Sequence, residues 1–264
     1  MKRIGFIGAG NMGGALCIAA SQTDCSLYVS DPDTVKAQML CKKTGATLAD
    51  NDAICEVCDL IFLGVKPQVL ASVAAELAPA LQSRNTPYCL VSMAAGVTLY
   101  RLSELFSKAA VIRIMPNTPV AVGQGMILYC YNEKATDEQV DTFLYAMQHA
   151  GKVDLLDEAL FDAATSVSGC GPAFAYMFAD ALAKGGEACG LPYEKAAAYA
   201  AQMMLGASLM LQTDGRTPEE LRRAVCSPGG STIEGVKVLQ ENDLEQTVTD
   251  AVQASFERNK QLGK

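Results

Sequence analysis

The sequence is short of basic residues. Its 264 residues include 21 Lys plus Arg against 29 Asp plus Glu, so the formal net charge at pH 7 is −8. Proteins that bind nucleic-acid duplexes depend on a basic face that neutralises phosphates, and this charge balance argues against such a partner. It does not argue against a small anionic ligand, because a nest of backbone amides can bind an anion on an acidic protein.

A long uninterrupted apolar run is also missing. The run Ile4–Ile7 is too short for the core of a signal peptide. The segment Ala196–Leu211 is the nearest to a membrane span, but Gln202, Gly206 and Ser208 interrupt it. We therefore expect a soluble, cytoplasmic protein without a membrane partner.

Histidine is almost absent, and the cysteines do not form a metal-binding pattern. His149 is the single histidine, and Cys55 and Cys58 make one CxxC pair with no second pair. Zinc sites need more ligands than this, so we predict no metal. Ten cysteines in a chain of this length are too dilute for a disulfide scaffold, and we expect reduced, buried thiols.

The first half of the sequence alternates short β-rich runs with stretches of helical composition such as Met12–Ser21 and Val69–Leu81. This alternation is typical of a parallel sheet with helices on both faces. A further run follows without a clear intervening helix, and we expect it at the edge of the sheet. In chain order the predicted strands are Arg3–Ile7, Ser26–Ser30, Leu60–Val65, Tyr88–Ser92, Ala110–Met115 and the edge strand Gly125–Tyr131.

The second half, from Asp157, reads as helices separated by turn signals. We therefore predict a dinucleotide-binding domain over residues 1–156 and an all-α domain over residues 157–264, which serves dimerisation and substrate binding. Its Ala- and Met-rich helices have little polar face, so we expect them to pack against a second copy of the chain. The predicted helices are Pro172–Gly190, Tyr193–Thr213, Pro218–Val225, Ile233–Glu241 and Leu244–Gln261.

A glycine motif joins the first predicted strand to the first predicted helix. Gly8 suits a tight turn, Gly10 a close approach of pyrophosphate to the backbone, and Gly13 close packing of helix on strand. The free N–H groups and dipole of the helix then favour phosphate. The motif predicts an α/β fold with a Rossmann-like, doubly wound, mainly parallel sheet that binds NADPH or NADH; the alternative is a glycine-rich turn without a ligand. The candidate phosphate-binding residues are Gly8, Ala9, Gly10, Asn11 and Met12.

Two interpretations of Asp31 stand side by side. With Ser30 it ends the second predicted strand, where a carboxylate binds the ribose 2′-OH of NAD and repels the 2′-phosphate of NADP. Alternatively, Asp31 caps a helix that begins near Pro32. No arginine follows before Arg84 to clamp a 2′-phosphate, although Lys36 offers a partial substitute.

Other strand ends are expected to line the same crevice, because ligands of open α/β sheets bind at the carboxyl ends of the strands. Small or rigid residues at these ends let a flat ring and a ribose lie close to the backbone. Lys66 is either a crevice residue or an ordinary solvated lysine. The candidates at these ends are Val65, Lys66, Pro67, Ala94, Ala95 and Asn117.

Taken together, six motifs resemble pyrroline-5-carboxylate reductase, in order and over essentially the whole chain. The last is the most specific, since SPGG-x-T-I before a helix is close to that family's signature. The motifs are GFIGAGNMGGAL, FLGVKPQ, MAAGVTL, RIMPNTP, SVSGCGPAFAY and CSPGGSTIEGVKVLQE. The resemblance implies reduction of the cyclic imine 1-pyrroline-5-carboxylate to L-proline with NADPH or NADH, the last step of proline synthesis.

The CSPGGST segment is the candidate substrate site. Its glycine-containing turn leads into a helix, so backbone N–H groups can bind the substrate carboxylate. The resemblance implies that the hydroxyl of Thr232, the candidate catalytic residue, meets the ring nitrogen. The alternative is a plain capping box, because Ser231 and Glu234 have its spacing. The candidate substrate-binding residues here are Ser227, Gly229, Gly230, Ser231 and Thr232.

The resemblance also implies three further contacts and a dimeric assembly. Asn51 would contact the adenosine region of the cofactor, Ala95 the nicotinamide side, and Glu158 the substrate pocket. Ala224 stands where many relatives have an asparagine that touches the cofactor, which puts that contact in doubt. We expect a homodimer through the helical domain, with a larger homo-oligomer such as a decamer left open.

Two other functions are compatible with a dinucleotide-binding domain followed by a helical domain. A β-hydroxyacid dehydrogenase would need a lysine as acid or base where this chain has Ala175, and an asparagine where it has Ala179. A non-catalytic, cofactor-binding regulatory homologue would keep the fold without turnover, but it would more readily lose the intact SPGGST segment.

Overall fold

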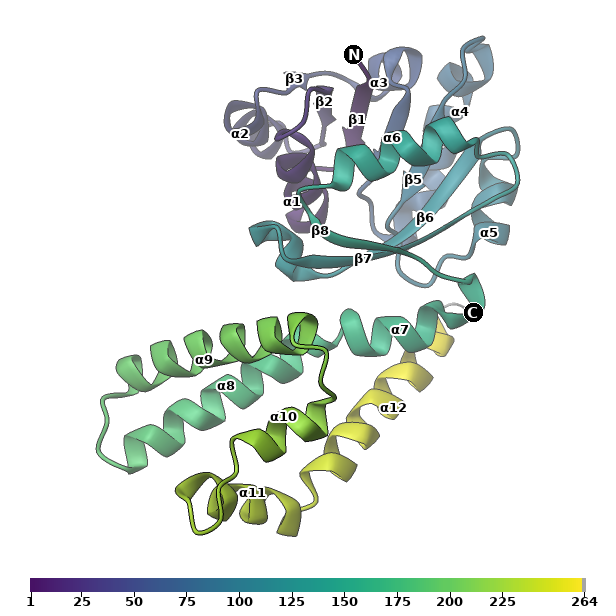
Figure 1. Ribbon diagram of the computed structural model, residues 1–264. Coiled ribbons are helices and arrows are strands. Elements are labelled where there is room, and N and C mark those ends of the chain that lie inside the picture. Colours follow the sequence, from purple (N-terminus) through teal and green to yellow (C-terminus); the bar gives the residue numbers. More distant parts are fainter. Residues whose placement is uncertain (263–264) are drawn as a thin grey trace. The chain divides into compact units, whose positions relative to one another are not determined.

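A computed structural model describes residues 1–262 and divides the chain into two compact units (Figure 1). One unit comprises Met1–Cys170 together with the residues from Ser255 onward, and the other comprises Gly171–Ala254. The last two residues of the predicted second domain lie outside the described residues.

The first unit is built on one eight-stranded sheet in the order β3-β2-β1-β4-β5-β6-β7-β8. Neighbouring strands are parallel except β6 and β7, which are antiparallel. The predicted α/β class with a mainly parallel, doubly wound sheet is therefore confirmed. The strands are β1 Arg3–Ile7, β2 Ser26–Ser30, β3 Thr47–Leu48, β4 Leu60–Leu63, β5 Cys89–Ser92, β6 Ala110–Pro116, β7 Gly125–Tyr131 and β8 Gly151–Leu155.

Helices cover both faces of this sheet. The core on one face joins α1, α2 and α6 to strand residues such as Phe6 and Phe62, whose rings stack. The core on the other face joins α3, α4 and α5 to Ile61 and Leu63. Strands buried on both faces read as continuous apolar runs, which explains why β1 and β4 were predicted well. The helices are α1 Asn11–Ala20, α2 Thr34–Thr44, α3 Asn51–Val57, α4 Leu70–Ser83, α5 Leu99–Leu105, α6 Asp137–Met147 and α7 Phe161–Ser168, with short 3₁₀ turns η1 Pro67–Val69, η2 Thr118–Val122 and η3 Glu158–Leu160.

The prediction that Gly125–Tyr131 lies at the sheet edge is wrong. β8 pairs parallel with β7 and forms the edge instead. β8 has only two apolar side chains, Val153 and Leu155, and three of its five residues are exposed, so it lacks the continuous apolar run of the buried strands. The two strands also begin at a glycine pair, where a side chain on Gly151 would collide with the backbone of Gly125.

The boundary between the units lies after Cys170, later in the chain than the sequence-based division near Asp157. The reason is α7, a helix that the sequence analysis did not anticipate. Its first residue, Phe161, is buried in a cluster with Leu128 and Cys130 of β7. The side chain of Asn259 near the end of the chain also donates to the carbonyl oxygen of Asp162 at 3.1 Å, so the chain end returns to the first unit.

The second unit is entirely helical within the described residues. α8 Gly171–Ala188 and α9 Tyr193–Thr213 pack against each other as a hairpin, followed by α10 Pro218–Ala224, α11 Ser231–Glu241 and α12 Leu244–Leu262, which ends in the first unit (Figure 1). The five helices agree with the predicted ones to within a few residues. No helix among residues 1–262 combines the length and the hydropathy needed to cross a membrane.

The α8–α9 hairpin leaves most of its apolar surface uncovered in a single chain. Its buried residues are alanines only, Ala183 on α8 and Ala196 and Ala200 on α9. Such a surface on a helical unit indicates a covering partner. The large apolar side chains exposed on these two helices include Tyr176, Met177, Phe178, Leu182, Tyr199, Met203, Leu205, Leu209, Met210 and Leu211.

Candidate functional site

The glycine-rich turn between β1 and α1 packs closely against neighbouring backbone. A side chain at Gly8 or Gly13 would clash with that backbone. Gly8 has φ +107°, and a Cβ atom there would lie 2.5 Å from the carbonyl oxygen of Gly64 at the end of β4. A Cβ atom on Gly13 would collide with the carbonyl oxygen of Gly8. Both glycines are therefore required by the packing of the turn against its neighbours.

Gly10 differs from the other two glycines of the motif. A Cβ atom there would meet nothing within 4 Å, so the protein itself gives no packing reason for glycine. Gly10 is also the N-cap of α1, without a capping side chain. The open space therefore lies at a helix end whose free N–H groups and dipole favour an anion, which fits the pyrophosphate of a dinucleotide.

Asp31 anchors this turn to the end of β2. Its Oδ2 accepts from the backbone N–H of Ala9 at 2.7 Å, and its Oδ1 accepts from the N–H of Asp33 at 2.8 Å. The capping interpretation of Asp31 is wrong, because α2 begins at Thr34 and Asp33 caps it by accepting from the N–H of Lys36. Asp31 thus keeps its carboxylate at the carboxyl end of the strand.

A pocket of about 580 Å³ opens at the carboxyl ends of β1, β2 and β4. This volume lies within the range of small-molecule and cofactor sites. The pocket brings together six of the predicted cofactor residues, namely Gly8, Ser30, Asp31, Asn51, Val65 and Lys66. Its other lining residues are Ile7, Pro32, Asp50, Asp52, Gly64, Val69, Val73 and Glu76.

Asn51 leaves one polar atom of this pocket without a partner. Its Nδ2 donates to Oε1 of Glu76 at 2.7 Å, whereas its Oδ1 is buried and accepts from no described group. Buried polar atoms are nearly always satisfied in folded proteins. A bound donor would satisfy this oxygen, so the residues present fit a cofactor that carries hydroxyl and amino groups.

The other predicted cofactor residues do not line this pocket. Ala9, Asn11 and Met12 lie on the glycine turn and the start of α1, and Pro67 opens η1 directly after Lys66. After β5, Ala94 is buried and Ala95 is exposed.

Asn117 has a structural role that the sequence did not indicate. Its Oδ1 accepts from the N–H of Met126 on β7 at 2.8 Å. Its Nδ2 donates to the carbonyl oxygen of Ser168 on α7 at 2.9 Å. The Asn117 amide therefore ties the loop after β6 to the next strand and to α7.

Glu158 makes two strong contacts within the first unit. Its Oε1 accepts from Nη1 of Arg113 and from the N–H of Leu99, both at 2.6 Å. The Arg113 side chain is only 8% exposed, and its guanidinium lies 4.6 Å from the centre of the Phe161 ring. Sequence reasoning missed Arg113, although a charged residue inside an apolar strand was a usable signal. Glu158 thus holds β6, η3 and the start of α5 together.

The candidate substrate turn keeps its hydroxyls free. The N–H of Gly230 donates to the carbonyl oxygen of Ser227 at 3.0 Å, and Gly229 has φ +74°. The capping-box alternative is wrong, because Gly230 is the N-cap of α11, no side chain caps the helix, and Glu234 pairs with Lys237. Within the described residues the hydroxyls of Ser231 and Thr232 have no partner.

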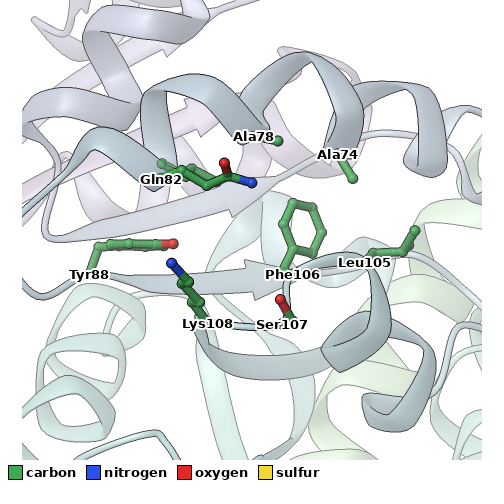
Figure 2. Close-up of a pocket in the computed structure, with 9 residues that line it drawn as sticks. Ala74, Ala78, Gln82, Tyr88, Leu105, Phe106, Ser107 and Lys108 are labelled. Carbon is green, nitrogen blue, oxygen red and sulfur yellow. The ribbon is translucent and has the colours of Figure 1, made fainter.

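A second, much smaller pocket lies at the opposite end of the sheet, between α4 and the turn that precedes β6 (Figure 2). Its volume is about 70 Å³, and none of the predicted site residues lines it. Figure 2 shows Phe106, Tyr88 and Lys108 among its walls. A dinucleotide does not fit this space, so it belongs to the packing between helices.

The prediction of buried thiols holds for five of the ten cysteines, whereas Cys189 is exposed and the other four are half-buried. All ten are free, and burial raises the pKa of Cys17, Cys55, Cys58, Cys89 and Cys130 to about 12. A raised pKa keeps the thiol protonated, whereas metal ligation and nucleophilic attack need the thiolate. Over residues 1–262 no group of three His, Cys, Asp or Glu is placed to hold a metal ion.

Comparison with known proteins places the chain in a family. The family described as pyrroline-5-carboxylate reductase dimerisation matches residues 158–262, and the family described as NADP oxidoreductase coenzyme F420-dependent matches residues 3–96. The pyrroline-5-carboxylate reductase of Pisum sativum is 36% identical, over 98% of this chain and 95% of the relative. The chain belongs to the pyrroline-5-carboxylate reductase family.

Solved structures of the pyrroline-5-carboxylate reductase family agree with this assignment. The enzyme from Coxiella burnetii is 30% identical with a TM-score of 0.91, over 99% of this chain and 98% of that one. The enzyme from Plasmodium falciparum, solved with NADP bound, is 29% identical with a TM-score of 0.87, over 100% of this chain and 98% of that one. Membership over the whole chain makes this protein an NAD(P)-dependent oxidoreductase and favours a homo-oligomer.

The three glycines of the turn are expected to respond differently to alanine. Gly13→Ala should lower the free energy of unfolding by about 2 kcal/mol or more, because the added carbon collides with backbone. Gly10→Ala should fold with unchanged stability but bind NADH at least about tenfold more weakly, because its carbon fills the space for the pyrophosphate. Urea denaturation and calorimetric titration with NADH measure the two effects. Unweakened binding by Gly10→Ala would contradict the assignment of this turn.

Removing Glu158 is expected to destabilise the first unit. Glu158→Ala leaves the Arg113 charge buried without its partner, and since Glu158 is itself 30% exposed, we expect a loss of about 2 to 3 kcal/mol, below the cost of a fully buried pair. The control Glu104→Ala breaks an exposed pair with Arg101 and should cost no more than about 0.5 kcal/mol. Unfolding in urea compares the two. A raised KM for substrate at unchanged stability would assign Glu158 to the substrate pocket alone.

Proposed function

We propose that this chain reduces the cyclic imine 1-pyrroline-5-carboxylate to L-proline with NADPH or NADH, as the last step of proline biosynthesis. The observation that carries the proposal is the substrate turn Ser227–Thr232, intact in a chain that matches the family over its full length. Its hydroxyls are not used for capping α11, so they are available to a ligand.

The substrate turn can hold an anion without any basic side chain. The first N–H groups of α11 have no partner within the helix, and the helix dipole adds positive potential at the same end. We assign the carboxylate of the substrate to these amides, with Ser227, Gly229, Gly230 and Ser231 shaping the turn. The partial positive charges of these backbone N–H groups bind the negative carboxylate. The net negative charge of the chain therefore does not prevent binding of this substrate.

Thr232 is the proposed catalytic residue. A protonated imine has an N–H that can donate to the Thr232 hydroxyl, which would orient the electrophilic carbon. When bound, the dihydronicotinamide supplies the hydride that this carbon accepts. Hydride addition to a protonated imine gives the neutral amine directly, so the reaction needs no further proton at the nitrogen. The protein therefore acts mainly by positioning the reactants.

The cofactor would be held at the carboxyl ends of the strands. We assign its pyrophosphate to the turn Gly8–Met12 and its adenosine end to Ser30, Asp31 and Asn51. Support comes from the open space at Gly10 and the unpartnered oxygen of Asn51. The nicotinamide side is assigned to the ends of the other strands, namely Val65, Lys66, Pro67, Ala94, Ala95 and Asn117.

The helical region 157–264 is proposed as the dimerisation and substrate domain. The exposed apolar side chains of α8 and α9 support a homodimer formed through this region, and assembly of such dimers into a decamer is the finer proposal. Glu158 remains a proposed neighbour of the substrate through the contacts it makes with Arg113 and Leu99. We also propose a cytoplasmic location, which the ten free cysteines support.

Turnover of 1-pyrroline-5-carboxylate tests the function, and Thr232 variants test the mechanism. Wild-type protein should oxidise NADH or NADPH when this imine is added. Thr232→Ala should lower kcat/KM by about 10- to 150-fold, which corresponds to losing a hydrogen bond to a charged partner worth about 1.5 to 3 kcal/mol. Initial rates followed by absorbance of the reduced cofactor give both results.

Thr232→Ser is the matched control, because it restores the hydroxyl and should recover most of the lost kcat/KM. Unchanged kcat/KM in Thr232→Ala would refute the role of this hydroxyl. Cofactor oxidation with a β-keto acid but not with the imine would refute the function.

The apolar face of the helical unit is expected to be an interface between copies. At micromolar concentration, wild-type protein should sediment as a dimer or larger species. The double variant Met203→Glu and Met210→Glu places charge on α9 at two side chains that are each 47% exposed, and it should dissociate the assembly. Val35→Glu, on an exposed site of α2 in the first unit, is the control that should not. A wild-type monomer in sedimentation equilibrium would exclude this interface.

A further inference from the structure

We propose that this chain selects NADH over NADPH, and that Asp31, supported by Asp50, Asp52 and Glu76, rejects the 2′-phosphate at the adenosine end of the pocket. The inference rests on the proposed cofactor site and adds a preference that family membership leaves open.

The carboxylates of the pocket outnumber its cations. Asp31, Asp50, Asp52 and Glu76 all line it, and in the part of the chain that the structure describes Lys66 is the single basic residue among its walls. A phosphate monoester carries a charge of about −1.5 to −2 at neutral pH. Bringing it among four carboxylates is unfavourable by Coulomb repulsion, whereas the uncharged 2′-hydroxyl of NADH meets no such cost.

The hydrogen-bonding groups of the pocket also match a hydroxyl rather than a phosphate. The Asp31 carboxylate is fixed by the N–H groups of Ala9 and Asp33, one on each oxygen, and each oxygen can still accept another bond. The buried Oδ1 of Asn51 is a second acceptor without a donor, and the amide is held in place by the bond that its Nδ2 donates to Glu76. A ribose hydroxyl donates to such oxygens, but a phosphate dianion has no hydrogen to donate.

The first cations that follow β2 in the sequence as candidates for a 2′-phosphate have other partners. Lys36, on the first turn of α2, pairs with Asp33 at 3.1 Å. Arg84 donates from Nη1 to the carbonyl oxygens of Cys55 and Cys58 at 2.7 and 2.6 Å. Neither side chain lines the pocket. In this arrangement Lys36 is held in an exposed ion pair and does not line the pocket.

Fragments of the two cofactors that lack the nicotinamide measure binding at the adenosine end separately from hydride transfer. Calorimetric titration of the full-length protein with ADP-ribose and with 2′-phospho-ADP-ribose gives two dissociation constants for each variant. For wild type we expect ADP-ribose to bind at least tenfold more tightly. NADH and NADPH, titrated in the same way, should show the same order.

Variants then assign the preference to the carboxylates. Asp31→Ser should reduce the ratio of the two dissociation constants at least fivefold, mainly by tightening the phosphorylated ligand. Asp52→Asn, which removes an exposed charge, should reduce it about twofold. Asp24→Asn removes the same charge at the far end of β2 and should leave the ratio unchanged. Should Asp31→Ser fail to fold without its bond to Ala9, Asp52→Asn and Glu76→Gln carry the test.

Equal or tighter binding of 2′-phospho-ADP-ribose by wild type would overturn the proposal, as would a ratio that none of the pocket variants changes. These outcomes are separate from failure of the proposed function. A protein that prefers ADP-ribose yet does not turn over 1-pyrroline-5-carboxylate with either cofactor would keep this inference and lose the reductase assignment.

Discussion

The backbone packing of Gly8, Gly13 and Gly64 is the constraint on which the cofactor site depends. A Cβ atom on Gly64 would lie 2.9 Å from the carbonyl oxygen of Gly8, and Gly13 packs against the same oxygen. This contact brings the ends of β1 and β4 and the start of α1 together. The N-terminal end of α1 is thereby held at the carboxyl ends of the strands, where an open α/β sheet binds its ligand.

A set of polar anchors extends this arrangement across the sheet. Asp31 fixes the glycine turn to β2, Asn117 fixes the loop after β6, and Glu158 with Arg113 fixes the start of α5. Each anchor satisfies backbone or charged groups that would otherwise be buried without partners. Loops at strand ends have few apolar contacts of their own, so hydrogen bonds of this kind determine how rigid the binding crevice is.

The helical unit buries much less apolar surface within a single chain than the first unit does. Small residues let α8 and α9 approach closely, as at Gly186 beside Ala196, but they bury little apolar area. The large apolar side chains point away from this contact and remain exposed in the single chain. Contact with another copy of the chain would bury these side chains and so stabilise the unit. This agrees with the match of this region to the dimerisation segment of the family.

The α/β class, the position of the phosphate-binding turn, the helices of the second unit and the family can all be inferred from the amino-acid sequence. These depend on local signals: apolar runs, glycines at fixed spacing, and a turn motif before a helix. The sequence does not show that β8 forms the sheet edge, because that strand is short and largely exposed and is recognised by its pairing with β7. It also left Asp31 and Ser231 with two roles each. The tertiary structure excludes the capping role of each, because the caps of α2 and α11 depend on where each helix begins. It also brings the four carboxylates of the pocket together from segments that are distant in the sequence.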